Sequence, residues 1–374
     1  MSIEIREVNS RRKLKQFVCF AHKLYKNHPY WVPSLLKGEM TTLSSKSNPS
    51  FEHCDTLFLM AYKDGKAAGR IAGIINHHYI EQWNKKDARF CWFDTIDDPE
   101  VTRSLFERIE KWAASKGMDR IIGPMGFTTF ERQGMLVSGF EEIPTFAGCY
   151  NYPYYSDHLK QLGFESEIQY VEYELKVPHE VPAKIMKISN LIKKRYGLHI
   201  LEVKKTKDML PYADPVFRVI NASYKPLYGF TTLTEKQIAY FVKRFFGFIK
   251  PDYVSAVIDR HNNVLGFQIS MPSLSKALQR AKGRLLPLGW FHLRRAMRNP
   301  ERIDTLLTGV LPEYQGKGVN AVFMTHLTQA AINTGIKYAE SNGELAENIK
   351  VQNTWRYFER RQHRRSKIFA RNIS

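Results

Sequence analysis

Residues 302–335, RIDTLLTGVLPEYQGKGVNAVFMTHLTQAAINTG, place a strand pattern, a glycine turn and a helix pattern in direct succession. Residues 305–311 are apolar and β-prone, which predicts a buried strand. Residues 319–332 predict a helix, because their apolar members form a single stripe. That stripe consists of Val319, Val322, Phe323, Leu327, Ala330 and Ala331.

The turn between these two elements, residues 312–318, is suited to an anion. The first turn of a helix carries unpaired backbone N–H groups and roughly half a positive charge. Gly316 and Gly318 let the backbone approach a phosphate without a Cβ in the way, and Lys317 adds a cation. The spacing is neither that of a Walker loop nor that of a Gly-x-Gly-x-x-Gly turn. The stretch therefore predicts a cradle for a pyrophosphate.

The segment Gln315-Gly-Lys-Gly318-Val-Asn320 resembles the acyl-CoA loop of the GNAT acyltransferase superfamily, Gln/Arg-x-x-Gly-x-Gly/Ala. Asn320 departs from the pattern, because the family has a small residue at that position. The resemblance implies that acyl-CoA or acetyl-CoA is the co-substrate and that no metal takes part. The cofactor-binding residues that it implies are Val310, Leu311, Gln315, Gly316, Lys317, Gly318, Val319 and Asn320.

The same resemblance implies how the acyl group is transferred. A backbone N–H of Gly309, Val310 or Leu311 would polarise the thioester carbonyl, because a peptide donor is fixed before charge develops on the oxygen. An amine aligned with the thioester then attacks directly. Glu340, at the end of the next predicted strand, is the candidate base for the amine proton.

Aromatic residues supply the remaining candidates. The family often places a tyrosine acid on the helix after that strand, and Tyr357 is the tyrosine in this region. Two alignments put Trp355 or Phe358 at the acid position itself, so the acid stays open. Tyr224 and Tyr228 lie where the family places its substrate-lining helices. No histidine has a serine or cysteine at a spacing that indicates a catalytic triad.

The order of predicted elements is the same in both halves of the chain, with a proline-bounded linker at residues 177–182. That order resembles the order of elements in a GNAT domain, and the resemblance implies an α+β protein of two tandem GNAT-like domains, residues 1–178 and 179–374. Each would have a mixed, mostly antiparallel sheet flanked by helices. Near the C-terminus we expect a helix over residues 344–361 and a last strand over 367–372.

The first domain is expected to lack the CoA loop. Where that loop would lie, the chain has Asp94, Asp97 and Asp98, whose carboxylates would repel a pyrophosphate. The second domain carries instead an insert at residues 271–300 with seven basic residues and no acidic one. Its mixture of leucines, a tryptophan and cations suits an anionic membrane surface. It equally suits a lid over a long acyl chain, or a basic surface helix whose apolar face lies in the core.

Charge is divided unevenly along the 374 residues. Residues 1–178 carry 23 basic and 23 acidic side chains, whereas the rest carry 33 and 14, which accounts for the net charge of +19. A basic half beside a neutral half indicates an anionic partner. Four scattered cysteines and no apolar signal or membrane-spanning run predict a cytoplasmic protein, with peripheral contact at the inner face of the membrane.

The function that these features predict is an acyl-CoA-dependent N-acyltransferase. Some tandem GNAT-like proteins of bacteria acylate lipid amines, as in ceramide formation, and the leucine-rich insert favours such a long-chain acceptor. One alternative is a Fem-like transferase that takes an aminoacyl group from tRNA, which the basic half favours. Another is a pseudo-enzyme that binds acyl-CoA or a lipid without turnover, which Asn320 favours.

Overall fold

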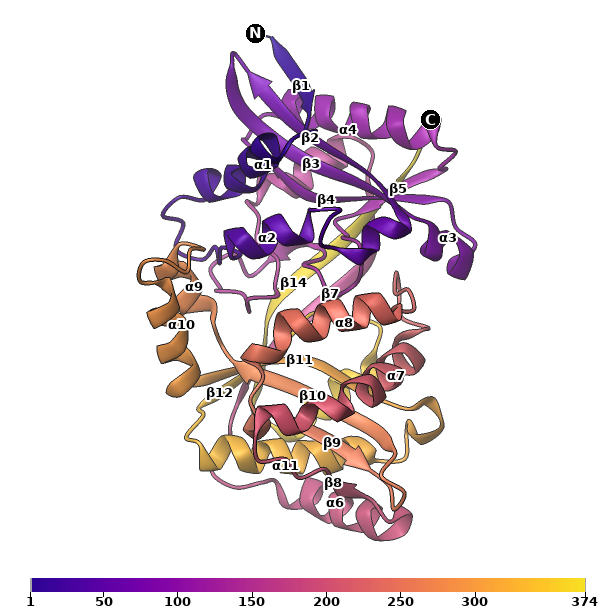
Figure 1. Ribbon diagram of the computed structural model, residues 1–374, viewed down its shortest axis with the longest axis vertical. Coiled ribbons are helices and arrows are strands. Elements are labelled where there is room, and N and C mark those ends of the chain that lie inside the picture. Colours follow the sequence, from indigo (N-terminus) through magenta and orange to yellow (C-terminus); the bar gives the residue numbers. More distant parts are fainter. Residues whose placement is uncertain (1, 374) are drawn as a thin grey trace. The chain divides into compact units, whose positions relative to one another are not determined.

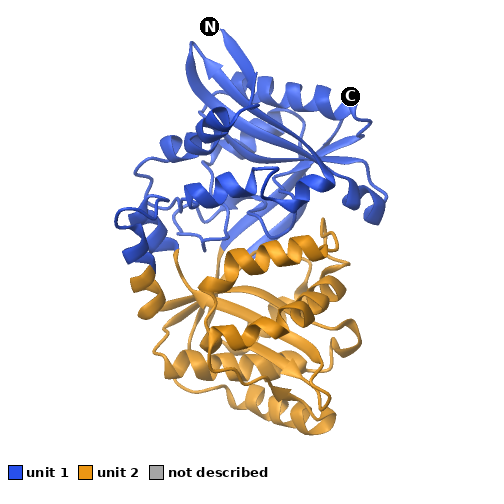
Figure 2. Ribbon diagram, in the orientation of Figure 1, with its two compact units in different colours: residues 1–171, 275–293, 364–374 blue, residues 172–274, 294–363 orange. Residues whose placement is uncertain are grey.

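The computed structural model describes residues 2–373, which form two compact units, each discontinuous in sequence (Figure 1). Unit 1 comprises residues 1–171, 275–293 and 364–374, and unit 2 comprises residues 172–274 and 294–363 (Figure 2). The expected halves correspond to these units except at 172–178, 275–293 and 364–374. None of the helices within residues 2–373 is both long and apolar enough to cross a membrane.

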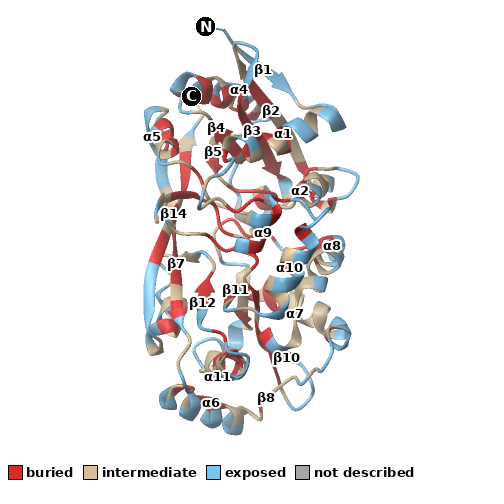
Figure 3. Ribbon diagram, turned by 90° about the vertical axis from the view of Figure 1, so that its left-hand side faces the viewer, coloured by how far each residue is buried: buried red, intermediate tan, exposed pale blue. Residues whose placement is uncertain are grey.

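Unit 1 is built on a sheet of mainly antiparallel strands. Neighbouring strands pair in the order β1-β2-β3-β4-β5-β14; β4 and β5 run parallel, and the other pairs run antiparallel. Their bounds are β1 Ile3–Glu7, β2 Cys54–Lys63, β3 Lys66–Asn76, β4 Asp87–Thr95, β5 Arg120–Gly123 and β14 Arg360–Asn372, with the short β6, Met135–Ser138, on β14. Figure 3 shows buried residues along the inner strands β2 to β5.

Three helices in the first part of unit 1, α1, α3 and α4, begin at residues whose side chains satisfy a free N–H group of the first turn. In α1 the hydroxyl of Ser10 accepts from the N–H of Lys13, and in α4 Asp98 accepts from the N–H of Glu100. The helices within residues 1–171 are α1 Arg11–Leu24, α2 Leu36–Thr42, α3 His77–Trp83, α4 Pro99–Ser115 and α5 Tyr154–Gln161. Their apolar faces and the strands enclose a core rich in phenylalanine.

Unit 2 repeats this plan. Its strands pair in the order β8-β9-β10-β11-β12-β7; β11 and β12 run parallel, and the other pairs run antiparallel. Their bounds are β7 Glu165–Lys176, β8 His199–Ile200, β9 Val254–Ile258, β10 Val264–Pro272, β11 Arg302–Val310 and β12 Tyr338–Ser341, with the short β13 at Glu344–Leu345. The single parallel pair therefore occurs at the same place in the strand order of both units, as a tandem repeat requires.

The helices of unit 2 are α6 Ala183–Tyr196, α7 Ala213–Tyr224, α8 Glu235–Phe245, α11 Val319–Asn333 and the short α12, Ile349–Gln352. α11 packs against α6 and buries the predicted stripe, apart from the half-buried Ala330 (Figure 1). Strand β11 and helix α11 confirm the strand and helix predicted from the opening stretch. Short 3₁₀ helices cover residues 206–212, 246–248, 251–253, 312–314 and 353–357, with one more at 49–52 in unit 1.

The predicted helix over residues 344–361 is wrong. The segment instead forms β13, α12, a 3₁₀ turn and the start of β14. The turn is fixed by the indole N–H of Trp355, which donates to Glu344 Oε1 at 2.6 Å. Strand β14 begins at Arg360, well before the predicted residue 367. The prediction missed these residues because charged side chains within the strand conceal its apolar pattern. Arg364, for example, is buried and donates to the carbonyls of Glu142 and Cys149.

Candidate functional site

Strands β11 and β12 separate partway along their length. Their parallel register runs from Arg302↔Tyr338 to Thr305↔Ser341, and the N–H of Asn342 closes it by donating to the Thr305 carbonyl at 3.2 Å. β12 ends there, whereas β11 continues to Val310 paired with β10. We call the edge of β11 from residue 306 to 310, which β12 leaves uncovered by backbone pairing, the wedge.

Backbone alternation decides which groups of β11 point into the wedge. The N–H of Leu311 donates to the Leu265 carbonyl on the β10 side at 2.8 Å, and the N–H of Val310 therefore points away from β10. The next backbone groups that point away from β10 are those of Thr308, and Tyr224 at the end of α7 binds both. Its hydroxyl accepts from the N–H of Thr308 at 3.2 Å and donates to the Thr308 carbonyl at 2.9 Å. Burial raises the pKa of Tyr224, which keeps the phenol neutral. Val310 is thus the predicted donor that the geometry favours.

The glycine turn between β11 and α11 has the backbone that the sequence predicts. Gly316 and Gly318 have φ values of 75° and 82°, a region that favours glycine. A Cβ on Gly318 would lie 3.1 Å from Ile192 of α6, whereas one on Gly316 would meet nothing within 4 Å. Gly318 is the N-cap of α11 and has no side chain with which to cap it. The helix therefore begins with N–H groups that no side chain of its cap satisfies.

Side chains around the turn add to this positive character. Gln315, Gly316 and Lys317 are exposed, and Gln315 Nε2 donates to the Val310 carbonyl at 3.0 Å, which ties the turn to the end of β11. Lys317 Nζ lies 5.4 Å from the ring centre of Tyr314 and 5.9 Å from that of Tyr196. The cation is thus held beside the turn, where an anion would approach.

The equivalent turn of unit 1, between β4 and α4, is filled by the chain's own carboxylates. Asp98 caps α4, and Lys63 pairs with it, which lowers the pKa of Asp98. Asp94 is buried and accepts from Arg70 Nε at 2.7 Å. Asp97 lies 3.1 Å from His158 Nε2. An internal anion therefore occupies the helix start that is glycine in unit 2.

One face of the unit 2 sheet collects charged side chains next to the wedge. Asp304 on β11 is in register with Glu340 on β12, and Glu340 is in register with Glu174 on β7. Arg302 Nη1 lies 2.7 Å from Glu174 and 3.4 Å from Glu340. Burial raises the pKa of Glu174, but the hydrogen bond and charge of Arg302 outweigh it, so the net shift is downward. Asp304 and Glu340 are buried one residue before the strands separate.

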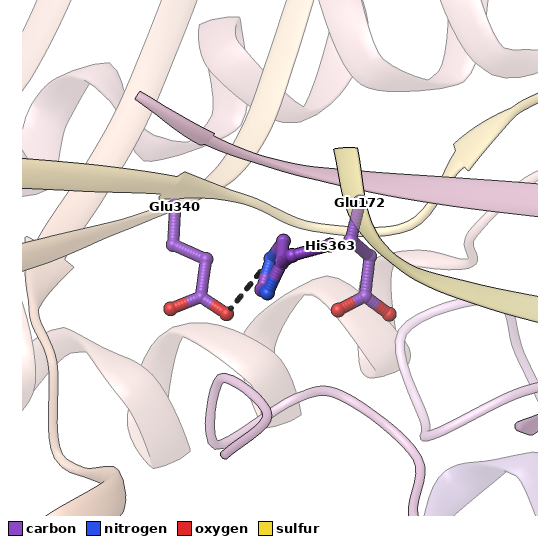
Figure 4. Close-up of side chains that lie close together, drawn as sticks. All are labelled: Glu172, Glu340 and His363. Atoms are coloured by element: carbon purple, nitrogen blue, oxygen red, sulfur yellow. Dashed lines mark ion pairs between the residues drawn. The ribbon is translucent and has the colours of Figure 1, made fainter. Parts of the chain in front are cut away.

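Glu340 shares this face with a histidine and a second glutamate. His363 Nε2 lies 3.3 Å from Glu340 Oε1, and Figure 4 shows its imidazole between the carboxylates of Glu340 and Glu172. All three are buried, and a ligand atom of each lies within 4.8 Å of those of the others. These three residues have the spacing to hold a divalent ion. Without an ion, they place the imidazole of His363, neutral or protonated, against Glu340, the predicted base.

Glu344 is a second unusual carboxyl near the end of β12. Burial raises its pKa to about 7, even though hydrogen bonds with Trp355 and Ser341 act in the opposite direction. Its Oε2 is buried and, among the described residues, has no hydrogen-bond partner. This carboxyl changes protonation state near neutral pH, which is the range in which a general acid or base is effective.

An apolar cavity of about 50 Å³ lies on the opposite face of the sheet. Thr305, the last residue of β11 that pairs with β12, lines it together with side chains of α11 and the Trp355 turn. The lining of the cavity is mainly aliphatic and includes Ile303, Met324, Leu327, Ala331 and Ala339. The point at which the strands separate is thus bordered by charge on one face and by apolar side chains on the other.

The other predicted residues lie at the margins. Tyr357 is in the 3₁₀ turn, where its hydroxyl accepts from Arg356 at 2.6 Å and its ring lies 5.8 Å from Lys184 Nζ. Tyr228 is half-buried in the loop after α7, four residues beyond Tyr224. Val319 is buried in the first turn of α11, and Asn320 beside it is half-buried. None of these contacts assigns a chemical role to Tyr357 or Tyr228.

Four charged or titratable residues of this region were not singled out by the sequence: Glu172, Asp304, Glu344 and His363. A signal existed for Asp304, because it directly precedes the apolar run of the predicted strand. His363 was hidden in a basic segment, and Glu172 lies near the end of the first half. Only the pairing of strands distant in sequence brings them together.

Comparison with known proteins agrees with this architecture. No protein-family model matches the chain. Protein YghO of Escherichia coli (strain K12) is 26% identical over 329 residues, covering 87% of this chain and 83% of that protein. A bacterial ceramide synthase of Caulobacter vibrioides is 26% identical over 315 residues, covering 82% and 80%.

Solved structures show the fold. A tandem GNAT protein from the clavulanic acid biosynthesis pathway superposes with a TM-score of 0.56 at 12% identity, covering 100% of this chain and 99% of that one. A GCN5-related N-acetyltransferase from Sphaerobacter thermophilus gives 0.51 at 8%, covering 99% and 96%. The chain therefore has the tandem GNAT fold that the order of its elements predicted.

Proposed function

From the tandem GNAT fold, we propose that this chain is an acyl-CoA-dependent N-acyltransferase whose reaction centre lies in unit 2. The observation that carries the proposal is the continuous arrangement of the wedge, the glycine turn and the uncapped start of α11. The 26% identity with a bacterial ceramide synthase supports acyl transfer to an amine. Because the donor is a cytoplasmic metabolite, the proposal places the reaction in the cytoplasm.

The turn would hold the pyrophosphate of the co-substrate. The first N–H groups of α11, at Val319 and Asn320, attract an anion, and Lys317 neutralises part of its charge. Gln315, tied to the Val310 carbonyl, fixes the turn against β11. From Val310 back to Thr305 the strand spans roughly 17 Å. The extended arm of the co-substrate would lie along this edge.

Along the wedge the chain's own groups have distinct tasks. The N–H of Val310 offers the carbonyl oxygen of the thioester a fixed donor. The acceptor nitrogen attacks the carbonyl carbon, the C–S bond breaks and the thiolate leaves, while the amine proton passes through water to Glu340, which is in register with Asp304 further back along β11. The imidazole of His363, whose Nε2 lies 3.3 Å from Glu340 Oε1, has one of two tasks. It stabilises the carboxylate form of Glu340, or it accepts the proton from Glu340 afterwards. No covalent enzyme intermediate is needed.

The acceptor that we propose is an amine on a hydrophobic molecule. The identity with a ceramide synthase supports this acceptor.

The acyl donor that we propose has a long chain. The apolar cavity beside Thr305 supports it, because the cavity has room for part of an acyl chain. Each buried CH₂ contributes about 0.8 kcal/mol, so four further buried carbons favour a long-chain donor by roughly a hundredfold. Acetyl-CoA is then a poor donor.

Release of free thiol from a panel of acyl-CoAs, with long-chain and soluble amines as acceptors, tests the proposal. We expect turnover with a long-chain amine and a rise in kcat/KM with acyl length. Glu340→Gln should lower kcat by roughly a hundredfold or more, whereas the exposed Glu347→Gln should not change it. Binding of CoA without turnover for any acceptor would instead indicate a pseudo-enzyme, and transfer from aminoacyl-tRNA a Fem-like one.

A further inference from the structure

The segment between α9, Ser275–Ala281, and α10, Gly289–Arg298, exposes an unusual amount of apolar surface. Ten large apolar side chains of the described residues are exposed, and five of them lie within residues 285–291. Their exposed fractions are 40% for Leu285, 78% for Leu286, 66% for Leu288, 48% for Trp290 and 49% for Phe291. We call residues 284–291 the apolar tip. A concentration of this kind marks an interaction surface.

The tip rises from a firmly packed base. Ala277, Leu278 and Ala281 of α9 are buried, and Ser275 Oγ donates to the Pro144 carbonyl at 2.6 Å. The Gly283 carbonyl accepts from the N–H of Leu36 at 2.9 Å. The apolar face of α9 therefore lies in the core of unit 1, as one interpretation of the insert predicted. The leucines after it do not, so core packing explains only the first part of the insert.

Along the chain, cations lie on both sides of the tip, and residues 271–300 contain no acidic residue. All seven basic residues of the insert are exposed, namely Lys276, Arg280, Lys282, Arg284, Arg294, Arg295 and Arg298. Trp290 lies in the first turn of α10, which carries three of them. Exposed leucines and an aromatic residue next to Lys and Arg form the pattern of a segment that enters a bilayer interface while its cations contact anionic headgroups.

We propose that the apolar tip docks this protein onto an anionic lipid bilayer. Leu286, Leu288 and Trp290 enter the interface, and Arg284 with the cations of α10 contacts the headgroups. Apolar exposure supplies the insertion, and the absence of acidic residues supplies the selectivity for negative lipid. Each Lys or Arg that reaches the surface raises affinity roughly fivefold. Docking does not require the proposed acyl transfer.

Co-sedimentation of the full chain with vesicles tests the docking. The vesicles are phosphatidylcholine alone, or phosphatidylcholine with phosphatidylglycerol. We expect binding to the anionic vesicles that weakens as salt rises, and at least tenfold weaker binding for Leu286→Glu/Leu288→Glu. The matched control is Leu191→Glu/Leu210→Glu, which changes two leucines with exposed fractions of 62% and 52% outside the tip. The control should bind as the wild type does.

Three results would overturn the proposal. One is wild-type protein that sediments with neither vesicle. Another is a tip variant that binds as well as the control. The third is a wild-type dimer, seen by light scattering, that the tip variant loses while vesicle binding is unchanged, because the tip would then contact a second copy of the chain. All three are readable even if the protein has no acyltransferase activity.

Discussion

At the scale of single residues, the proposed reaction centre contains carboxyls whose surroundings differ. Glu174 is held ionised by Arg302, whereas Glu344 is driven toward its neutral form by burial. Glu340 is buried, and its Oε1 lies 3.3 Å from His363 Nε2. Carboxyls in such different environments within one short region can divide the roles of acid and base between them.

The raised pKa of Glu344 makes stability depend on pH. Its ordinary value is 4.5 and its folded value about 7, so the unfolded chain loses this proton first. The protonated form supports folding fully below about pH 4.5, and this contribution is lost as pH rises through about 7. The loss is on the order of 3 kcal/mol.

Glu344→Gln should remove that fall in stability, because a glutamine stays neutral and can still accept from Trp355. Urea unfolding at about pH 5 and about pH 8 measures it. The wild type and the Glu347→Gln control should lose stability between the two, and Glu344→Gln should lose clearly less. Equal pH dependence in all three proteins would show that Glu344 has an ordinary pKa.

At the scale of elements, the glycine turn lends itself to a sharp substitution. Gly316 has a positive φ that Asn and Asp tolerate better than other residues, and a Cβ there meets nothing within 4 Å. Gly316→Asp therefore adds a negative charge without disturbing the packing, which a change at Gly318 would do through Ile192.

We expect Gly316→Asp to weaken CoA binding at least tenfold, while Gly316→Asn, its uncharged counterpart, changes it by roughly threefold or less. Titration calorimetry with CoA measures both. Equal affinities for the two variants would mean that no phosphate lies against this turn, and the proposed cofactor site would be lost.

Helix starts also set the number of CoA molecules that the chain can bind. α11 begins at a glycine, whereas α4 begins at Asp98 paired with Lys63. Calorimetry should therefore give one CoA per chain, because unit 1 already has a carboxylate where a phosphate would bind. If the wild type bound two CoA molecules per chain and Gly316→Asp still bound one, unit 1 would bind CoA as well.

Individual helices and strands also show most clearly what could be predicted from the sequence. The apolar run of β11, the two glycines and the stripe of α11 are local patterns, and they predicted that stretch well. The helix over 344–361 failed because its true partners, such as Glu344 for Trp355, are tertiary. The buried charges of β14 conceal a strand, and the grouping of Glu172, Glu340 and His363 arises only from long-range pairing. Spacing along the chain contains no record of that pairing.

At the scale of the whole molecule, the two units share the ends of two strands. β7 has its first residues in unit 1 and its last in unit 2, and β14 runs from unit 2 back into unit 1. Phe369–Asn372 of β14 pair with Arg120–Gly123 of β5 within unit 1. A fragment of residues 1–178 would therefore lack the strand that covers β5.

We expect that fragment to aggregate, because β5 would present an unpaired edge. The full chain should stay soluble under the same conditions, and a fragment with residues 360–374 joined to its end should recover part of that solubility. Soluble yield and circular dichroism measure the three proteins. A fragment 1–178 that melts cooperatively like the full chain would contradict this view of β14.

The return of β14 to unit 1 also has a consequence for synthesis on the ribosome. Translation runs toward the C-terminus, yet the sheet of unit 1 needs residues 364–372, which emerge only after unit 2 has been made. While unit 2 is being made, the nascent chain must carry β5 without β14 beside it, a state in which chaperones hold other chains. A ribosome that stalls before residue 364, or a stop codon there, would thus damage unit 1 even though nearly all of that unit has already been made.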